Sequence, residues 1–215
     1  MLLRTLAAAW ASGILLTTVA TAQIPAFAAE TRQPAAAGER IAVLAGGCFW
    51  GVDAVFKHVK GVSRVVSGYS GGNDATATYD VVSSGTTGHA ESVQITYDPS
   101  QVSYSRLLQV FFSVAHDPTE LDRQGPDVGT QYRSAIFYAD ADQKHTALLY
   151  IDQLNKSKVF PRPIVTEVVP LQHFYPAEEY HQNFLARHPY YPYIVINDQP
   201  KLKQLQKQFP SLYRE

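Results

Sequence analysis

The residue with the clearest chemistry in this sequence is its one cysteine, Cys48, in the segment GGCFWG. The apolar run at 41–45 predicts a buried strand that ends at two glycines. Apolar residues spaced by three or four positions from Phe49 onward predict a helix directly after the cysteine. Unpaired backbone N–H groups and the positive end of the helix macrodipole favour a thiolate at such a position. The sequence therefore predicts a nucleophilic cysteine at a strand-to-helix junction.

The alternative for Cys48 is an inert, buried, small apolar residue, which is a common role for a free cysteine. Two observations favour reactivity: the glycines before it allow a substrate to approach closely, and Phe49 and Trp50 place apolar faces beside the sulfur. Acyl-transfer chemistry is disfavoured, because position 50 is Trp where a nucleophile elbow needs Gly. The local signatures of papain-type and caspase-type proteases are also missing.

A metal centre is not predicted. His89-Ala90-Glu91 matches half of a zinc-deaminase motif, but the other half requires two further cysteines. The seven histidines do not form an HExxH pattern, and one cysteine excludes intramolecular disulfides and multi-cysteine metal sites. We expect no bound metal and no bound cofactor.

Composition limits the partners. The 215 residues include 18 Lys and Arg against 19 Asp and Glu, so the chain lacks the basic excess that nucleic-acid binding requires. A hydrophobic fraction of 46% is typical of a compact globular protein, and the length suggests one main domain. We expect no nucleic-acid partner.

The N-terminus has the pattern of a secretory signal peptide. A single basic residue, Arg4, precedes an apolar run at 6–19, and small residues recur in the small-x-small arrangement at 20–22 and 26–28. A transmembrane anchor is the competing interpretation, but the run is shorter than the roughly 20 residues that span a bilayer. We expect a cleaved signal and a periplasmic or secreted protein that is not held in the membrane.

The domain boundaries follow from this pattern. We predict a signal peptide at 1–28, with cleavage after Ala28 favoured and cleavage after Ala22 left open. A flexible leader at 29–38 and a single globular domain at 39–215 would follow.

Strands and helices are interleaved along the globular domain. Strands are predicted at 41–45, 65–69, 91–97, 134–138 and 165–169, and helices at 49–59, 104–114, 142–154 and 199–208. Two strands in succession before the second long helix favour a mixed or antiparallel sheet, and hence an α+β two-layer sandwich. The stretch at 172–193, rich in Tyr, Pro and His, is expected to wrap the surface, with His181 either packing or capping.

These segments resemble a known family, the A-type peptide methionine sulfoxide reductases. The resemblance covers nearly all of the globular domain, and its motifs are GGCFWGVDAVF at 46–56, GYSGG at 68–72, TYDVVSSGTTGHAESVQITYDP at 78–99, HDPT at 116–119, RQGPDVGTQYRSAIF at 123–137 and AEEYHQNFL at 177–185. It implies a two-layer α/β sandwich with a ferredoxin-like core around a mixed sheet and a long coiled C-terminal segment. It also implies that Cys48 attacks the sulfoxide sulfur, with Phe49 and Trp50 forming the apolar pocket for the methyl group on that sulfur.

The resemblance assigns the polar half of the site as well. Glu91 would bind and protonate the sulfoxide oxygen, the hydroxyls of Tyr79 and Tyr132 would be further donors, and Asp127 would lie nearby. Attack on sulfur requires that charge accumulating on oxygen be neutralised by donors already in place. A free glutamate titrates near ~4.3, so Glu91 can donate near neutral pH only if burial raises its pKa.

The expected reaction is reduction of the S epimer of methionine sulfoxide, free or in proteins, which repairs oxidised proteins. Many family members carry resolving cysteines near the C-terminus, whereas residues 172–215 contain none. The sulfenic acid expected on Cys48 would then need an external thiol, such as a thioredoxin-like protein, a glutaredoxin or a small thiol. The alternatives are a thiol peroxidase, which needs a polar peroxide site, and a non-enzymatic thioether-binding module. We expect a monomer.

Overall fold

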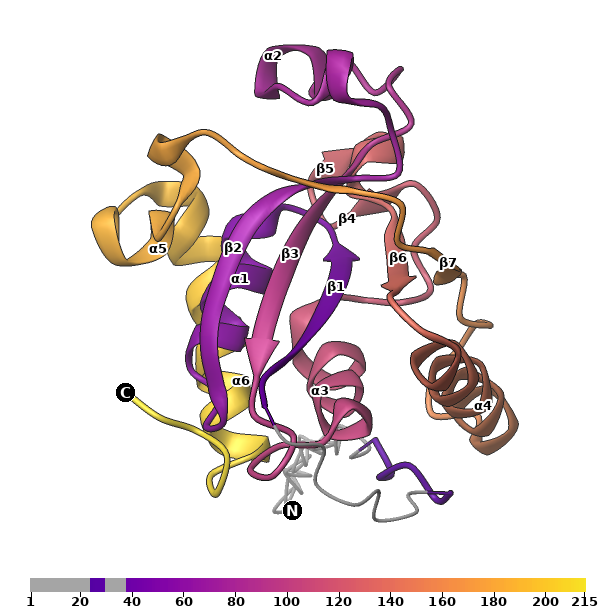
Figure 1. Ribbon diagram of the computed structural model, residues 1–215. Helices are drawn as coiled ribbons and strands as arrows, with labels where there is room; N and C mark the ends of the chain where they lie inside the picture. The colour runs from indigo at the N-terminus through magenta and orange to yellow at the C-terminus, as the bar shows by residue number, and fades with distance from the viewer. Residues whose placement is uncertain (1–23, 30–37) are drawn as a thin grey trace, which may run out of the picture.

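The fold is built on a six-stranded mixed sheet (Figure 1). The computed structural model describes residues 24–29 and 38–215. The sheet has the order β7-β6-β1-β3-β2-β8. Its strands are β1 (Arg40–Gly46), β2 (Val62–Ser70), β3 (Ala90–Tyr97), β6 (Ser134–Tyr138), β7 (Glu167–Pro170) and β8 (Phe174–Pro176). A separate two-stranded ribbon pairs β4 (Arg123–Gln124) with β5 (Asp127–Val128).

The four central strands have the ferredoxin-like arrangement. In chain order these strands are β1, β2, β3 and β6, and in the sheet they lie in the order β6-β1-β3-β2 with antiparallel neighbours. Helix α1 (Phe49–Lys57) connects β1 to β2, and helix α3 (Tyr104–Val110) lies between β3 and β6. Two crossover units are thus interleaved, which is the split βαβ motif. The α+β fold with a ferredoxin-like core is confirmed.

The main core lies between one face of the sheet and the helices. Leu44 and Ile136 of the sheet are fully buried together with Phe56 of α1, Leu107 of α3 and Tyr150 of α4 (Ala141–Ser157). The helical spacing after Cys48 directs one face of α1 inward, because residues three or four positions apart lie on the same side of a helix. In Figure 1, α1 lies behind the sheet and α4 at its β6–β7 edge.

The opposite face of the sheet is covered by an extended segment. Val43 and Phe137 form a second, smaller buried cluster on this face, against which Val169, Leu171 and Phe174 pack. The chain runs from β7 at one edge of the sheet to β8 at the other, crossing in front of the sheet in Figure 1. This is the first part of the long coiled C-terminal segment that the resemblance implies.

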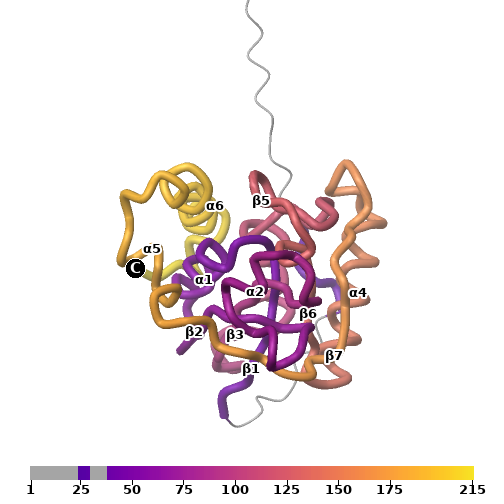
Figure 2. The backbone as a smooth tube through the Cα atoms, turned by 90° about the horizontal axis from the view of Figure 1, so that it is seen from above, coloured from indigo at the N-terminus to yellow at the C-terminus, as the bar shows by residue number. Residues whose placement is uncertain are grey.

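The rest of the C-terminal segment returns to α1. It contains α5 (Phe184–Arg187), a π-helical turn at Ile194–Asp198 and α6 (Gln199–Gln208). Figure 2 shows α5 and α6 beside α1, on the side away from α4. All three elements contact α1, so the end of the chain covers the helix that follows the cysteine.

Most predicted elements are found within a few residues of their expected bounds. The helix expected at 104–114 ends as an α-helix at Val110 and continues as a π-helical turn at Phe111–Ala115. Helix α4 begins one residue earlier than expected because Asp140 caps it, its side chain accepting a hydrogen bond from the Gln143 N–H, and it ends three residues later. Strand β8 and the four-residue helix α2 (Tyr79–Val82) were not expected.

The predicted signal peptide and leader lie mostly outside the described residues, which include only 24–29 and Gly38 of those two segments. Within the described part of the chain, no helix combines the length and the apolar character needed to cross a membrane.

Candidate active site

Cys48 lies at the N-cap of α1, where β1 turns into the helix. The turn requires glycine at position 47, whose φ is +87°, and a Cβ there would lie 2.5 Å from the Gln124 side chain. The thiol is buried, with 9% of the residue exposed, and accepts a hydrogen bond from the backbone N–H of Trp50. The predicted strand-to-helix junction is therefore confirmed.

The expectation that Cys48 is a thiolate does not hold for the protein without substrate, because the pKa of its thiol is raised. Burial raises the pKa of the thiol well above its ordinary value, and the carboxyl groups of Glu91, Asp198 and Asp127 raise it further. The Trp50 N–H lowers the pKa, but its effect is smaller than that of burial. The helix N-terminus thus favours the thiolate, while loss of solvent and nearby acidic groups favour the neutral thiol.

Glu91 lies beside the start of the same helix. It pairs with Tyr69 in the β2–β3 ladder, is 3% exposed, and its Oε2 accepts a hydrogen bond from the Phe49 N–H at 3.0 Å. Burial raises the pKa of its carboxyl to about 8, with a further contribution from Asp127, while the Phe49 N–H opposes the rise. Glu91 is accordingly protonated at neutral pH, which is the condition for it to act as an acid.

Two tyrosines face the same space. Tyr79 begins α2, and Tyr132 ends the 3₁₀ turn Thr130–Tyr132 that follows Gly129, whose φ is +139°. Burial raises the pKa of each phenol, and Glu91 and Cys48 raise both further. Both hydroxyls therefore remain protonated donors, close enough to Cys48 and Glu91 to sense their charge.

Asp127, on β5, lies on the polar side of the site. Its Oδ2 accepts a hydrogen bond from the Tyr193 hydroxyl. Its charge contributes to the raised pKa of Cys48, Glu91 and Tyr132. The structure thus brings together the cysteine and every polar residue that the sequence selected.

Trp50 forms an aromatic wall with the C-terminal segment. Its indole stacks on the Phe184 ring, with centroids 3.7 Å apart and planes at 5°, and its Nε1–H donates to His181 Nδ1 at 3.2 Å. Tyr191 and Tyr193 meet the indole edge-on. Phe49, which is fully buried, also packs against His181, with ring centroids 5.0 Å apart. The two residues expected to form an apolar pocket are thus fixed by residues more than 130 positions away.

Sequence reasoning missed most of the C-terminal contribution. Glu178 accepts hydrogen bonds from the Tyr69 hydroxyl and the Tyr79 N–H, both at 2.9 Å, and so fixes the start of α2. His181 does pack, as expected, but it also orients Trp50. The available signal was the AEEYHQNFL motif, which places Glu178 and His181 at the two ends of one 3₁₀ turn. Nothing comparable marks Tyr193.

A buried ion pair lies against the first turn of α1. Asp198 is fully buried, its Oδ1 accepts from Lys201 Nζ at 3.2 Å, and its Oδ2 has no hydrogen-bond partner. A Cβ at Gly51 would lie 2.1 Å from Asp198 Oδ1, so only glycine fits there. The Asp198 carboxyl is among the groups that raise the pKa of the Cys48 thiol.

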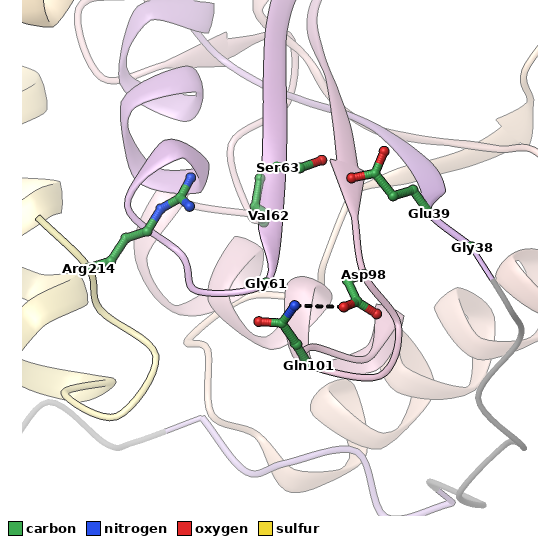
Figure 3. A pocket seen from close by; sticks show the side chains of 8 residues that line it. All are labelled: Gly38, Glu39, Gly61, Val62, Ser63, Asp98, Gln101 and Arg214. Atoms are coloured by element: carbon green, nitrogen blue, oxygen red, sulfur yellow. Dashed lines mark hydrogen bonds between the residues drawn. The ribbon is translucent and has the colours of Figure 1, made fainter.

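The pocket drawn in Figure 3 is remote from this site. It lies where β2 begins and β3 has ended, at the opposite end of these strands from Glu91, and is lined by polar groups including Glu39 and Arg214. Gln101 and Asp98 bind each other there through a 2.6 Å hydrogen bond. Among the described residues, no group of three or more His, Cys, Asp or Glu side chains has the geometry of a metal site.

The arrangement around Cys48 contains the groups that thiol chemistry needs. A buried cysteine faces a protonated carboxyl and two phenols, and an aromatic wall adjoins it. Such a site suits a substrate with a polar oxygen next to small apolar groups, where the thiol reacts and the acid protonates the oxygen.

Comparisons with known proteins identify the family. The family model described as peptide methionine sulfoxide reductase matches residues 40–212. A peptide methionine sulfoxide reductase of Mesorhizobium japonicum is 60% identical over 183 residues, covering 85% of this chain and 94% of the relative. A Thermus thermophilus enzyme of the same name is 50% identical over 176 residues, covering 82% of this chain and 98% of that one. The chain belongs to the A-type peptide methionine sulfoxide reductases, which are oxidoreductases acting on sulfur.

Solved structures agree with this assignment. The methionine sulfoxide reductase A of Corynebacterium diphtheriae is 34% identical and has a TM-score of 0.62. The match covers 75% of this chain and 81% of that one. Reduced Mxr1 of Saccharomyces cerevisiae is also 34% identical, with a TM-score of 0.64 and coverage of 72% of this chain and 88% of that one.

Proposed function

We propose that this reductase acts on the S epimer of methionine sulfoxide, free or within proteins, and converts it to methionine through a sulfenic acid on Cys48. The observation that supports this mechanism most is the position of Glu91. Its carboxyl is buried, with a pKa of about 8, and accepts a hydrogen bond from the residue next to the cysteine. A protonated acid is thus available close to the nucleophile at neutral pH.

The chemical step transfers one oxygen atom and two electrons. Cys48 Sγ attacks the sulfoxide sulfur while Glu91 protonates the sulfoxide oxygen, and the hydroxyls of Tyr79 and Tyr132 stabilise the charge on that oxygen. The attack forms a bond between Sγ and the substrate sulfur. This bond and the sulfur–oxygen bond of the substrate then break as the protonated oxygen moves to Sγ as a hydroxyl group. The products are the thioether methionine, reduced by two electrons, and the Cys48 sulfenic acid, oxidised by two. The thiol proton returns to Glu91.

The raised pKa of Cys48 fits this sequence of events. A neutral thiol in the free enzyme resists alkylation and oxidation by peroxide, since the thiolate is the reactive form. A bound sulfoxide brings an oxygen that takes up a proton, which allows the thiol to ionise as it attacks. The Trp50 N–H that donates to Sγ is in place to stabilise the emerging thiolate.

The aromatic wall supports the choice of substrate. Phe49 and Trp50 would hold the methyl group on the sulfoxide sulfur, opposite the polar donors. When the methyl group and the oxygen each have a fixed site, the two epimers differ in where the rest of the methionine extends from the sulfur. The epimers are then distinguished by which of them leaves the sulfur open to Cys48. Specificity for the S epimer follows from the family resemblance.

Regeneration would use external thiols. The sequence contains one cysteine, so a first external thiol condenses with the sulfenic acid, releasing water and forming a mixed disulfide. A second thiol then displaces Cys48 and leaves the external pair as a disulfide. A thioredoxin-like protein, a glutaredoxin or a small thiol can supply both equivalents.

The test is a turnover assay with each epimer of a chromophore-labelled methionine sulfoxide and dithiothreitol. We expect reduction of the S epimer only, and a mass increase of one oxygen on Cys48 after a single turnover without thiol. The Cys48→Ser variant is the control and should be inactive. Reduction of hydrogen peroxide in preference to either epimer would indicate a thiol peroxidase. Binding of methionine without any turnover would indicate a thioether-binding module.

We also propose a periplasmic or secreted location and a monomeric state. The N-terminal apolar run and small-x-small sites support export. The monomeric state is supported by the site itself, since one chain supplies the nucleophile, the acid and the aromatic wall. Cell fractionation tests the location. Light scattering of the purified protein at micromolar concentration tests the mass, and a stable dimer would contradict the proposal.

A further inference from the structure

Residues 24–28 lie in the segment predicted as signal peptide, yet they pack against the folded domain. Ile24 is 6% exposed and belongs to the main hydrophobic core. Its carbonyl oxygen accepts a hydrogen bond from Gln109 Nε2 at 2.8 Å, and Gln109, on α3, is itself buried. In Figure 1 this short indigo segment lies below α3 and α4.

Helix α4 holds the next four residues. The Tyr150 hydroxyl donates to the Pro25 carbonyl at 2.7 Å, and the Phe27 ring meets the Tyr150 ring edge-on at 5.6 Å. Gln153 makes two hydrogen bonds at 2.8 Å: its Nε2 donates to the Ala26 carbonyl, and its Oε1 accepts from the Ala28 N–H.

These contacts have the character of a built interface. Each carbonyl from Ile24 to Ala26 receives a donor from a different side chain of α3 or α4. Each of these hydrogen bonds stabilises the folded state, and so does the burial of the Ile24 side chain. Removal of the segment would also expose apolar core surface and leave buried Gln109 without this acceptor. A discarded signal sequence gains nothing from such contacts.

The sequence offers two sites for a signal peptidase, after Ala22 and after Ala28. Cleavage after Ala28 removes all of the contacts, whereas cleavage after Ala22 keeps them. We propose that residues 24–28 are an N-terminal anchor of the mature protein and that the signal is removed by hydrolysis of the Ala22–Gln23 peptide bond. Water adds across that bond, giving a carboxylate on Ala22 and the amino group of Gln23 as the new N-terminus.

The direct test is to express the full chain with its own N-terminus in a Gram-negative host and to analyse the exported protein. We expect intact-mass measurement and N-terminal sequencing to place the first residue at Gln23. A mature chain that begins at Ala29, or a chain that still begins at Met1, overturns the proposal.

A second test measures whether the anchor stabilises the domain. Chains 23–215 and 29–215 are compared, each with and without Gln153→Ala. We expect 23–215 to have a melting temperature higher by several degrees, and Gln153→Ala to lower it by a few degrees only in that longer chain. The exposed His145→Ala on the same helix is the control and should act equally in both. Failure of only the shorter chain to fold also supports the anchor, while equal melting temperatures, or equal effects of Gln153→Ala, overturn it.

The anchor contacts lie on α3 and α4 and involve none of the residues around Cys48. The outcome is therefore independent of the proposed reaction, since either proposal can fail without the other.

Discussion

Replacing Glu91 with glutamine is the most informative single change at this site. Glutamine keeps the size of the side chain and an oxygen that accepts the Phe49 N–H, but it has no acidic proton. With a pKa of about 8, the carboxyl is about 90% protonated at pH 7, whereas an unperturbed glutamic acid would be about 0.3% protonated. A positioned general acid contributes roughly 10²–10⁴-fold in rate, so Glu91→Gln should slow the chemical step by that factor.

The assay is a single turnover without thiol, quenched at intervals and analysed for methionine. For the wild-type enzyme we expect the rate to decrease above about pH 8 as Glu91 loses its proton. The residual rate of Glu91→Gln should lack this decrease, while binding of methionine sulfoxide should change little. A variant rate within threefold of wild type at pH 7 would refute the role of Glu91 as the acid.

The same substitution has a consequence for stability that does not depend on catalysis. Between about pH 4.5 and 8 the folded state keeps the Glu91 proton while the unfolded state loses it, so the free energy of unfolding decreases as pH rises through this range. The full decrease is at most about 5 kcal/mol, because each pKa unit corresponds to ~1.4 kcal/mol. Urea unfolding at pH 5 and pH 9 should show Glu91→Gln gaining stability relative to wild type. Parallel pH profiles would contradict the raised pKa.

Three further outcomes are expected. Tyr193→Phe removes the hydroxyl that donates to Asp127, and should reduce kcat/KM for free methionine sulfoxide by roughly tenfold, since a hydrogen bond to a charged group is worth ~1.5–3 kcal/mol. An unchanged kcat/KM would show that Asp127 needs no such partner. Asp198→Asn removes a charge that raises the pKa of Cys48, so the pH profile of iodoacetamide alkylation should move to lower pH, and an unmoved profile would contradict this effect. Trp50 is the only tryptophan after residue 22, and its fluorescence should change when methionine sulfoxide binds to the Cys48→Ser variant; a signal that does not respond would place the substrate elsewhere.

The sequence predicted those elements that satisfy a local hydrophobic period. Strand β1 and helix α1 were recognised because an apolar run and a 3.6-residue repeat meet at two glycines. Strand β8 has three residues and α2 has four, so neither is long enough to show a period. Both are held by tertiary contacts instead, with β8 paired to β2 and the α2 N-terminus bound by Glu178.

Motifs identified the polar residues around Cys48, but they did not predict the ionisation state of the Cys48 thiol. The ionisation state of Cys48 was inferred from its position before a helix, which is a local property. Its raised pKa comes from burial and from acidic groups on other elements, including Asp198, 150 residues away in sequence. Tyr193 was missed for the same reason, since its partners Asp127 and Trp50 are distant in the chain.

The return of the C-terminal segment to Trp50 has a consequence for biosynthesis. The strands and helices of the ferredoxin-like core precede Phe184, Tyr193 and Asp198 in the chain, so they leave the ribosome first. A nascent or truncated chain that ends before residue 184 therefore has the segments of the core but lacks the ring that stacks on Trp50. Cys48 thus acquires its finished surroundings only when the complete chain is available to fold.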